Sequence, residues 1–219
     1  MRTIVLPGVL EPPSDCRLLA QVMRELRLAR GAAALEIFAG SGVLAVNAAL
    51  DGAREVTAVD ISARAVLNAW LNGFLNRVRV RALRGDLFAP VAGERFDLIV
   101  ANPPYLPGGS DELPAGGIER AWEGGRDGRR LLDRLCSEAS GHLTQRGRLL
   151  LVQSSLSGER ATLDRLAESG LSASVLARQR GPLGPIAAAR VDLLRRRGLL
   201  DAGEDEEEII VIGADRGSG

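Results

Sequence analysis

Short apolar runs alternate with amphipathic stretches along most of this chain. Residues 34–38 and 96–101 are mostly apolar and lead into polar or glycine-containing turns, which is typical of strands buried in a parallel sheet. Apolar positions three and four residues apart, such as Leu19, Val22 and Met23, are typical of helices. The alternation predicts an α/β fold with a largely parallel sheet.

The same pattern places the individual elements. Strands are expected at residues 34–38, 55–59, 78–83, 96–101 and 148–153, with a closing pair at 171–178 and 188–194. Helices are expected at residues 16–30, 42–50, 62–71 (capped by Ser62), 127–143 (capped by Asp127) and 159–169. Most strands thus alternate with helices, as in repeated strand–helix–strand units.

Two further segments interrupt this regularity. Residues 106–126 are rich in glycine and proline, and a loop of this length in a compact domain is usually functional. We expect one domain over residues 1–200, followed by a tail over 201–219. The acidic run 204–208 predicts a solvated surface, and the apolar residues 209–212 predict an extra edge strand.

Composition narrows the class of protein. The chain has 219 residues, of which 46% are hydrophobic, and this suits one domain with a sizeable core. Its formal net charge is zero, whereas domains that bind nucleic acid tightly are usually basic. Cys16 and Cys136 match no metal-ligand spacing and favour a reducing cytosol over a disulfide. His142 falls in a predicted helix as a surface or packing residue. No leader sequence and no membrane-spanning run are expected.

Three features at the ends of successive strands suit a nucleoside cofactor. Glycines at 40 and 42 permit a tight strand-to-helix turn and close approach of a ligand, although Ala45 stands where a dinucleotide fingerprint has its third glycine. Asp60 follows the second strand, where a carboxylate can accept from both ribose hydroxyls. Asp86 follows the third strand and could accept from an adenine amino group, while Leu87 covers the ring. Each acid alone could be a surface turn residue, but their order makes coincidence improbable.

The fourth strand ends in Asn102-Pro103-Pro104-Tyr105. The two prolines lack a backbone N–H, so this loop is rich in acceptors and poor in donors. The Asn102 side-chain carbonyl and the Pro103 backbone carbonyl could together accept both hydrogens of a planar –NH2 group, and Tyr105 could stack on its face. Such a site suits an amide or aryl amine whose nitrogen is alkylated. The plainer alternative is a strand that ends in a proline turn.

The order of glycine turn, ribose acid, adenine acid and Asn-Pro-Pro-Tyr resembles the class I S-adenosylmethionine-dependent methyltransferases. Within them the chain is similar to the HemK-type glutamine methyltransferases that modify class I peptide-chain release factors. It is most similar to their short form, which lacks the N-terminal helical domain of the bacterial enzymes. The similarity covers roughly residues 8–195 and is carried by three segments, residues 11–15, 102–105 and 117–128.

The resemblance implies a Rossmann-like fold with a mostly parallel seven-stranded sheet, and S-adenosyl-L-methionine as the cofactor. The cofactor-binding residues that it implies are Glu36, Phe38, Gly40, Gly42, Asp60, Ile61, Asp86, Leu87 and Asn102. The catalytic residues that it implies are Asn102, Pro103, Pro104 and Tyr105. It implies a cytoplasmic enzyme without a metal of its own that acts on a protein, most plausibly a release factor. It also allows for a small zinc-binding activator protein that covers an exposed strand.

The chain departs from the family at two places near the expected cofactor. Cys16 stands where the short form usually has a threonine that touches the carboxylate end of the cofactor, and a thiol is the poorer hydrogen-bond partner. Phe38 and Ala39 replace the smaller Gly-Ser of many relatives, although their backbone atoms can still face the cofactor.

Two other functions compete with glutamine methylation. An RNA or DNA amino-methyltransferase would use the same loop on an exocyclic amine of adenine or guanine. Its best basic stripe is Arg77, Arg79, Arg81 and Arg84, which could equally solvate a sheet edge. A binding module without activity is disfavoured by the intact Asn-Pro-Pro-Tyr.

The glycines of residues 106–126 favour a protein substrate, because they would let this loop close over an extended, glycine-flanked peptide. In that arrangement Trp122 would wall the pocket, and Arg120 or Arg126 would meet the surface of the partner. The alternative is a disordered connector with Trp122 packed in the core.

Overall fold

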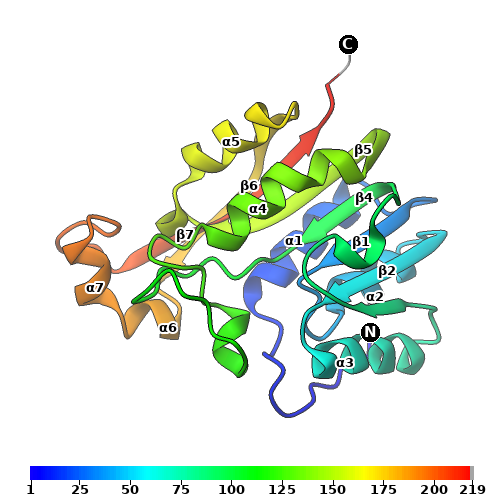
Figure 1. Ribbon diagram of the computed structural model, residues 1–219, viewed down its shortest axis with the longest axis horizontal. Helices are drawn as coiled ribbons and strands as arrows, with labels where there is room; N and C mark the ends of the chain where they lie inside the picture. Colours follow the sequence, from blue (N-terminus) through cyan, green and yellow to red (C-terminus); the bar gives the residue numbers. More distant parts are fainter. Residues whose placement is uncertain (218–219) are drawn as a thin grey trace.

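A computed structural model describes residues 1–217. Seven strands form one sheet in the order β3-β2-β1-β4-β5-β7-β6 (Figure 1). Their bounds are β1 Ala33–Ile37, β2 Glu55–Asp60, β3 Arg81–Arg84, β4 Phe96–Ala101, β5 Leu143–Ser154, β6 Ser172–Pro182 and β7 Glu206–Asp215. The first five strands run parallel to one another, and β7 pairs antiparallel with both β5 and β6. This confirms the Rossmann-like, mostly parallel seven-stranded sheet.

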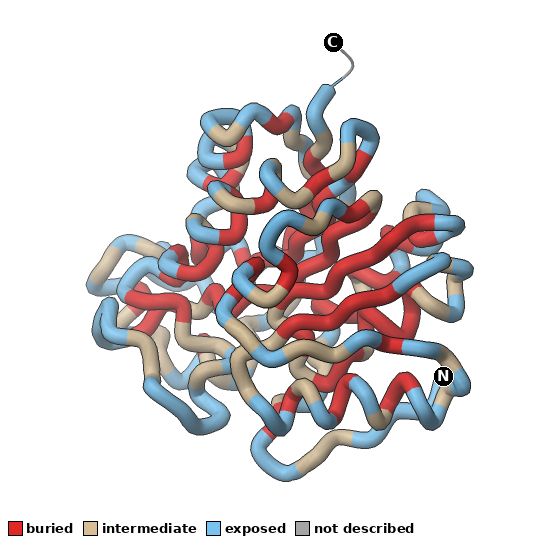
Figure 2. The backbone as a smooth tube through the Cα atoms, turned by 45° about the vertical axis from the view of Figure 1, so that its right-hand side comes forward, coloured by how far each residue is buried: buried red, intermediate tan, exposed pale blue. Residues whose placement is uncertain are grey.

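The helices cover both faces of the sheet. Their bounds are α1 Ser14–Glu25, α2 Val43–Leu50, α3 Ala63–Leu75, α4 Arg130–Ala139, α5 Glu159–Glu168, α6 Pro185–Ala188 and α7 Val191–Arg196. Short 3-10 turns lie at Ala89–Val91, Ile118–Ala121, Ser140–His142 and Ser155–Ser157. Helices α1 and α2 share one hydrophobic cluster with the sheet and α4 shares the cluster of the other face. The inner strands β2, β1, β4, β5 and β7 are therefore largely buried, whereas the edge strands β3 and β6 are more exposed (Figure 2).

Most predicted elements are present with shifted ends. Strand β4 matches the prediction, and β1 and β2 match it within a residue. The first helix ends at Glu25 rather than 30, and β3 covers only Arg81–Arg84. The helix predicted over 127–143 is shorter in the structure, where α4 begins at Arg130 and ends at Ala139. It cannot extend to residue 143, because residues from 143 onward belong to β5. His142 ends a 3-10 turn and stacks on Phe88 with ring centroids 4.4 Å apart.

Residues 188–194 were predicted as a strand, and that prediction is wrong. They belong to α6 and α7, which lie together at one end of the molecule (Figure 1). Pro185 is pre-set for the first turn of α6. Ala187 and Leu194 then pack with Leu156 and Leu200 in a small separate cluster. Helical spacing, rather than alternation, therefore buries the apolar residues of this connection.

Residues 209–212 do form a strand, but the predicted edge position is wrong. Strand β7 lies between β5 and β6, inside the sheet. Ile210 and Ile212 join the cluster on the α4 face, and Val211 joins the cluster on the α1 face. An unbroken apolar run is what a strand buried on both faces requires, whereas an edge strand with one solvated face would alternate. The acidic run is also only partly solvated, because Glu207 is buried.

A ladder of three asparagines holds the N-terminal arm. Asn68, Asn72 and Asn76 follow one another every four residues on α3, and their side chains accept from the backbone N–H groups of Leu6, Ile4 and Arg2, respectively. Four helical residues rise about 6 Å and two extended residues about 6.6 Å, so the two repeats match. The side-chain amide of Asn72 also donates to the carbonyl of Ser41 at 2.8 Å. The arm thus leads from α3 into residues 8–16, which border the cleft described below.

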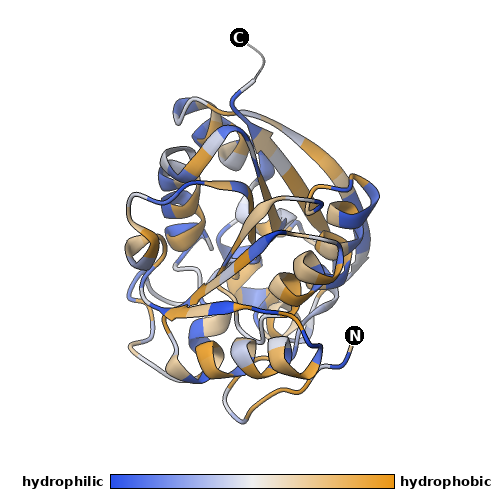
Figure 3. Ribbon diagram, turned by 90° about the vertical axis from the view of Figure 1, so that its right-hand side faces the viewer, coloured by the Kyte–Doolittle hydropathy of each residue, from blue (hydrophilic) through white to orange (hydrophobic). Residues whose placement is uncertain are grey.

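Three further observations describe the fold. The two cysteines are free thiols and both are buried. Within residues 1–217 no helix is long and apolar enough to cross a membrane. Apolar residues gather in the sheet and on the inner sides of the helices, with polar residues along the outer surface (Figure 3).

Candidate active site

A cleft of about 740 Å³ opens at the carboxyl ends of the parallel strands. The strand order reverses between β1 and β4, since the chain adds β2 and β3 on one side and β5 on the other. Open α/β sheets bind ligands at this switch point. Every sequence-predicted site residue except Gly42 lies on the cleft wall, and Gly42 adjoins it as the N-cap of α2. The carboxyl ends of parallel strands share one sheet edge, which brings these distant residues together.

The turn after β1 is built for close approach of a ligand. Phe38, Gly40 and Gly42 have φ angles of 60°, 52° and 74°, in the left-handed region that favours glycine. A Cβ atom on Gly42 would lie 2.5 Å from the Cβ of Ala69, so this position has room for no side chain. Phe38 adopts the same conformation without being glycine, which is uncommon for a bulky residue.

Glu36 lies beneath this turn and is almost fully buried. Its two carboxyl oxygens accept from the backbone N–H groups of Leu44 and Ala45, at 3.3 and 2.8 Å, at the start of α2. Burial raises the pKa of Glu36 to about 8, and the two hydrogen bonds only partly oppose this effect. A buried carboxyl that can take up or release a proton near neutral pH therefore borders the cleft.

Asp60 ends β2 on the opposite side of the turn. One carboxylate oxygen accepts from the N–H of Gly40 and the other from the N–H of Ser62, both at 2.8 Å. Burial raises the pKa of Asp60, while these two hydrogen bonds oppose the rise. Each oxygen retains a second lone pair, so the fixed carboxylate could accept from two neighbouring hydroxyls of one ligand. Ile61 borders the cleft beside it.

Asp86 and Leu87 form the end of the cleft next to β3. Leu87 is buried and has a φ angle of 47°. Asp86 is half exposed and pairs with Arg134 of α4 at 3.0 Å. This ion pair can hold the acid in place for an amino group, and Leu87 supplies an apolar surface next to it.

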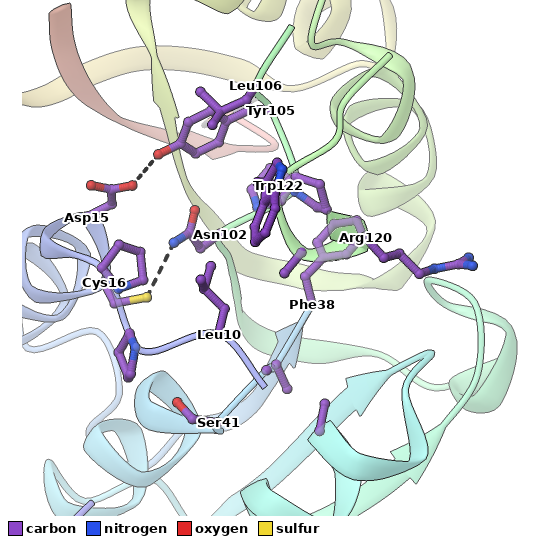
Figure 4. A pocket seen from close by; sticks show the side chains of 18 of the residues that line it. Leu10, Asp15, Cys16, Phe38, Ser41, Asn102, Tyr105, Leu106, Arg120 and Trp122 are labelled. Atoms are coloured by element: carbon purple, nitrogen blue, oxygen red, sulfur yellow. Dashed lines mark hydrogen bonds between the residues drawn. The ribbon is translucent and has the colours of Figure 1, made fainter. Parts of the chain in front are cut away.

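The Asn-Pro-Pro-Tyr loop after β4 is fixed by two consecutive residues of α1. The Asn102 amide nitrogen donates to the sulfur of Cys16 at 3.3 Å, and the Tyr105 hydroxyl donates to the carboxylate of Asp15 (Figure 4). Burial, and then the Asp15 charge, raise the pKa of Tyr105 well above its ordinary value, so its hydroxyl keeps its proton. The Oδ1 of Asn102 lies on the far side of the amide from Cys16 and, within residues 1–217, has no hydrogen-bond partner.

Of the three residues of the loop after Tyr105 that the sequence analysis proposed for substrate contact, two lie at the cleft. Trp122 and Arg120 both line the cleft. The Arg120 guanidinium donates to the carbonyls of Pro114 and Ala115, at 3.0 and 3.1 Å, and so braces the loop. Arg126 is exposed and lies outside the cleft lining. The segment contains a 3-10 turn at Ile118–Ala121 and an isolated bridge between Leu106 and Glu123.

Sequence reasoning missed the half of the cleft that the C-terminal part of the chain builds. Glu207 of β7 is buried at the cleft wall, where it accepts from the Ser154 hydroxyl and from the N–H of Gly184. Residues of β6 and α6 complete this wall, among them Pro182, Pro185 and Ile186. Glu207 is one of five consecutive acidic residues, 204–208, so the sequence gives no obvious reason to expect it to be buried. The alternation of side chains between the two faces of a strand is the signal that could have identified it.

The charged residues around the cleft are predominantly acidic. Arg120 is the cation among the lining residues, against Glu11, Asp15, Asp60, Asp86 and Glu207, while burial favours the neutral form of Glu36. Such a wall repels a polyphosphate backbone and tolerates a neutral or cationic ligand.

Comparison with known proteins gives concordant results. Residues 14–116 match the methyltransferase small domain family. The chain is 38% identical, over 80% of its length and 87% of the relative, to a putative protein N5-glutamine methyltransferase of Methanocaldococcus jannaschii. It is 32% identical, over 79% of its length and 85% of the relative, to methyltransferase HEMK2 of Homo sapiens.

A solved structure supports the fold. The Mtq2–Trm112 complex of E. cuniculi, which is responsible for methylation of the eRF1 translation termination factor, matches with a TM-score of 0.64 at 21% identity. The match covers 96% of this chain and 99% of that chain. The fold, the position of the cleft and the sequence similarity are thus all those of a methyltransferase.

Proposed function

Since the chain belongs to the HemK-type family of protein glutamine methyltransferases, we propose that it methylates the side-chain amide nitrogen of a glutamine in a peptide-chain release factor, with S-adenosylmethionine as methyl donor. The fixed amide of Asn102 carries this proposal. Because Cys16 holds its nitrogen, its oxygen is free to accept one hydrogen of a substrate –NH2 group, and the Pro103 carbonyl follows directly to accept the other.

The cofactor half of the cleft fits S-adenosylmethionine. The Asp60 carboxylate has lone pairs for both ribose hydroxyls, and Asp86 with Leu87 suits an adenine ring. Burial favours the protonated, neutral form of Glu36, so this residue would border the cofactor as a hydrogen-bonding carboxyl rather than as a counter-ion. The bound cofactor would supply a methyl group on a sulfonium, which is an electrophile without help from a metal.

The acceptor needs orientation more than deprotonation. An amide nitrogen is a poor nucleophile because its lone pair is delocalised into the carbonyl. Two hydrogen bonds to Asn102 and Pro103 would turn this nitrogen toward the methyl group and stabilise the positive charge that develops on it. The extra proton then leaves to water. Tyr105 holds the loop through Asp15 and offers its ring as a wall of the acceptor site.

The acidic cleft favours a protein over a nucleic acid as the substrate. Of the arginines proposed for the nucleic-acid alternative, Arg81 is paired with Glu94 at 2.8 Å, and Arg84 donates to the Ile61 carbonyl. Both lie on β3, at the sheet edge. None of the four arginines of this stripe lines the cleft, and we do not favour an RNA or DNA amino-methyltransferase.

Mass spectrometry of a release factor incubated with enzyme and cofactor tests this function. A gain of about 14 Da on the glutamine of its Gly-Gly-Gln loop is expected, since each methyl transfer adds one CH2. Asn102→Ala should bind cofactor as the wild type does and lose about 100-fold or more in turnover. Label incorporated into RNA alone, with none in the release factor, would refute the proposal.

The edge of β3 suits a small zinc-binding activator. An edge strand offers unpaired backbone groups to a strand of another chain. Trp70 and Phe74 of the adjacent helix α3 are 51% and 70% exposed, and their rings stack with centroids 6.0 Å apart. Such an aromatic pair on a surface marks a contact site. The relative from E. cuniculi was solved with Trm112 as its partner.

Co-expression with a Trm112-type protein tests this contact. We expect the two to co-purify, and Phe74→Asp to abolish co-purification, while Leu26→Asp, an equally polar change at another exposed apolar position, leaves it intact. Equal co-purification of wild type and Phe74→Asp would exclude this surface.

A further inference from the structure

The connection between β6 and β7 stands over the acceptor half of the cleft. Cofactor-type residues lie at the ends of β1, β2 and β3, and Asn102 follows β4. The remaining cleft is lined by residues of β6 and β7, and Pro185, Ile186 and Ala187 of α6 form part of its wall. Ile186 is half-buried there, with part of its side chain open to the cleft.

The same connection grips the loop that follows Asn-Pro-Pro-Tyr. Arg190, between α6 and α7, pairs with Glu123 and donates to the Pro107 carbonyl at 3.0 Å. Arg197, at the end of α7, donates to the carbonyls of Gly108 and Arg126, both at 2.6 Å. The Arg190 and Glu123 side chains are only 24% and 17% exposed, so their pairing is partly shielded from water.

Each of these contacts lies close to a residue of the cleft. Glu123 directly follows Trp122, and Pro107 directly follows Leu106, and both neighbours line the cleft. Leu106 also packs against the apolar cluster of Leu156, Ala187, Leu194 and Leu200, which joins α6 and α7 to the end of β5. At the other end of α6, the N–H of Gly184 donates to buried Glu207. The connection is thus fastened on both sides of the acceptor half.

We propose that residues 183–205 are the substrate-recognition element of this enzyme, with Ile186 as a specificity-determining wall and Arg190 as a positioning residue that acts through Glu123 and Trp122. This inference rests on the proposed function, because it names what selects the glutamine-bearing peptide. The chemistry of the wall suits an extended, uncharged peptide segment with small flanking residues. Pro182, Pro185 and Ile186 give this wall an apolar surface, and the guanidinium groups of Arg190 and Arg197 are occupied by Glu123 and by loop carbonyls.

Steady-state kinetics with a release factor as acceptor tests the inference. Arg190→Met keeps the length of the side chain but removes its charge and its donors. We expect KM for the release factor to rise about tenfold, as a lost, partly buried charge pair implies, with kcat changed less than about threefold and cofactor affinity unchanged. Arg196→Met, at an exposed position at the end of α7, is the matched control and should leave both constants at the wild-type values.

Two further variants keep the test decisive. The double variant Arg190→Glu with Glu123→Arg restores the charge pair in the reverse orientation. Its KM for the release factor should therefore lie closer to the wild-type value than that of Arg190→Met. Ile186→Trp places a larger side chain at the cleft wall and changes none of the contacts made by Arg190 and Arg197. It should raise KM for the release factor and leave cofactor affinity unchanged. This variant tests the inference independently if Arg190→Met does not fold.

The outcomes distinguish this inference from the function on which it rests. A wild type that does not methylate the release factor would refute the proposed function itself. A wild type that methylates it, with KM for the release factor within about twofold of normal in both Arg190→Met and Ile186→Trp, would overturn only the recognition role of residues 183–205.

Discussion

The amide nitrogen of Asn102 donates to the sulfur of Cys16 across 3.3 Å, and this contact decides which end of the amide faces the cleft. Burial raises the pKa of the Cys16 thiol to about 12, so the sulfur stays protonated and is a weak, neutral acceptor. The carboxylate of the neighbouring residue, Asp15, accepts a hydrogen bond from the Tyr105 hydroxyl. The first turn of α1 therefore orients both ends of the Asn-Pro-Pro-Tyr loop.

Replacement of Cys16 by valine should lower turnover. Valine has a similar size but accepts no hydrogen bond, so the Asn102 amide could rotate. We expect kcat to fall roughly three- to tenfold, the equivalent of about 1 kcal/mol for a neutral hydrogen bond. Cys16→Thr should retain the wild-type rate because a hydroxyl is the better acceptor. Single-turnover rates measure the effect, and a loss of cofactor affinity instead of rate would show that Cys16 contacts the cofactor.

Replacement of Asp60 by alanine should weaken cofactor binding by about 2–3 kcal/mol, because two charge-assisted hydrogen bonds are lost. The backbone N–H groups of Gly40 and Ser62 would lose their acceptor as well, so thermal unfolding must accompany the titration. Asp60→Asn, which keeps one acceptor oxygen, should fall between wild type and Asp60→Ala. Calorimetry that gives the same affinity for Asp60→Ala and wild type would rule out this carboxylate as the ribose ligand.

Protonation of Glu36 should make stability depend on pH. Its pKa is about 8 in the folded protein against an ordinary value of 4.5, so the folded state holds a proton that the unfolded state releases between these values. The contribution to stability is complete below pH 4.5 and is lost as pH rises through 8. Relative to Glu36→Gln, the wild type should lose more than about 1 kcal/mol of unfolding free energy between pH 5 and 8.5. Urea unfolding at several pH values measures this difference, and parallel curves for the two proteins would contradict it.

Loss of the Asn72 amide should destabilise the fold. This side chain is 1% exposed, and it accepts from Ile4 and donates to the Ser41 carbonyl. Asn72→Leu keeps the shape but leaves these backbone groups unpaired, at a cost of about 1–3 kcal/mol. Asn76→Leu is the matched control, because its partners on Arg2 are solvent-exposed and water can replace the lost bonds. Equal unfolding free energies for the two variants would show that the buried hydrogen bonds of Asn72 do not contribute this stability.

Prediction from sequence succeeded where local pattern and burial agree. The cofactor-type residues follow apolar runs, and the shared edge of parallel strands brings Gly40, Asp60 and Asp86 to one cleft without further information. The Asn-Pro-Pro-Tyr loop was found in the same way, since β4 is buried along its length and ends at Ala101.

The acceptor half of the cleft could not be predicted, because it depends on contacts between distant segments. Arg190 is an ordinary surface arginine in the sequence, and only the fold brings it to Glu123. Glu207 stands among other acids and becomes special when β7 enters the sheet interior. The apolar run at 209–212 did carry a signal of interior position, and the acidic residues before it obscured that signal.

The place of β7 between β5 and β6 also bears on biosynthesis. When β6 leaves the ribosome it has no neighbour in the sheet, because its partner is encoded some 30 residues later. Until residues 206–215 are available, the edge of β5 that faces away from β4 and both edges of β6 lack a partner, and both strands are open to wrong partners. Strand β7 follows β6 in the chain and closes the sheet beside β5, and it brings Glu207 to the cleft, so the cleft wall to which Glu207 belongs cannot be complete before this strand is in place.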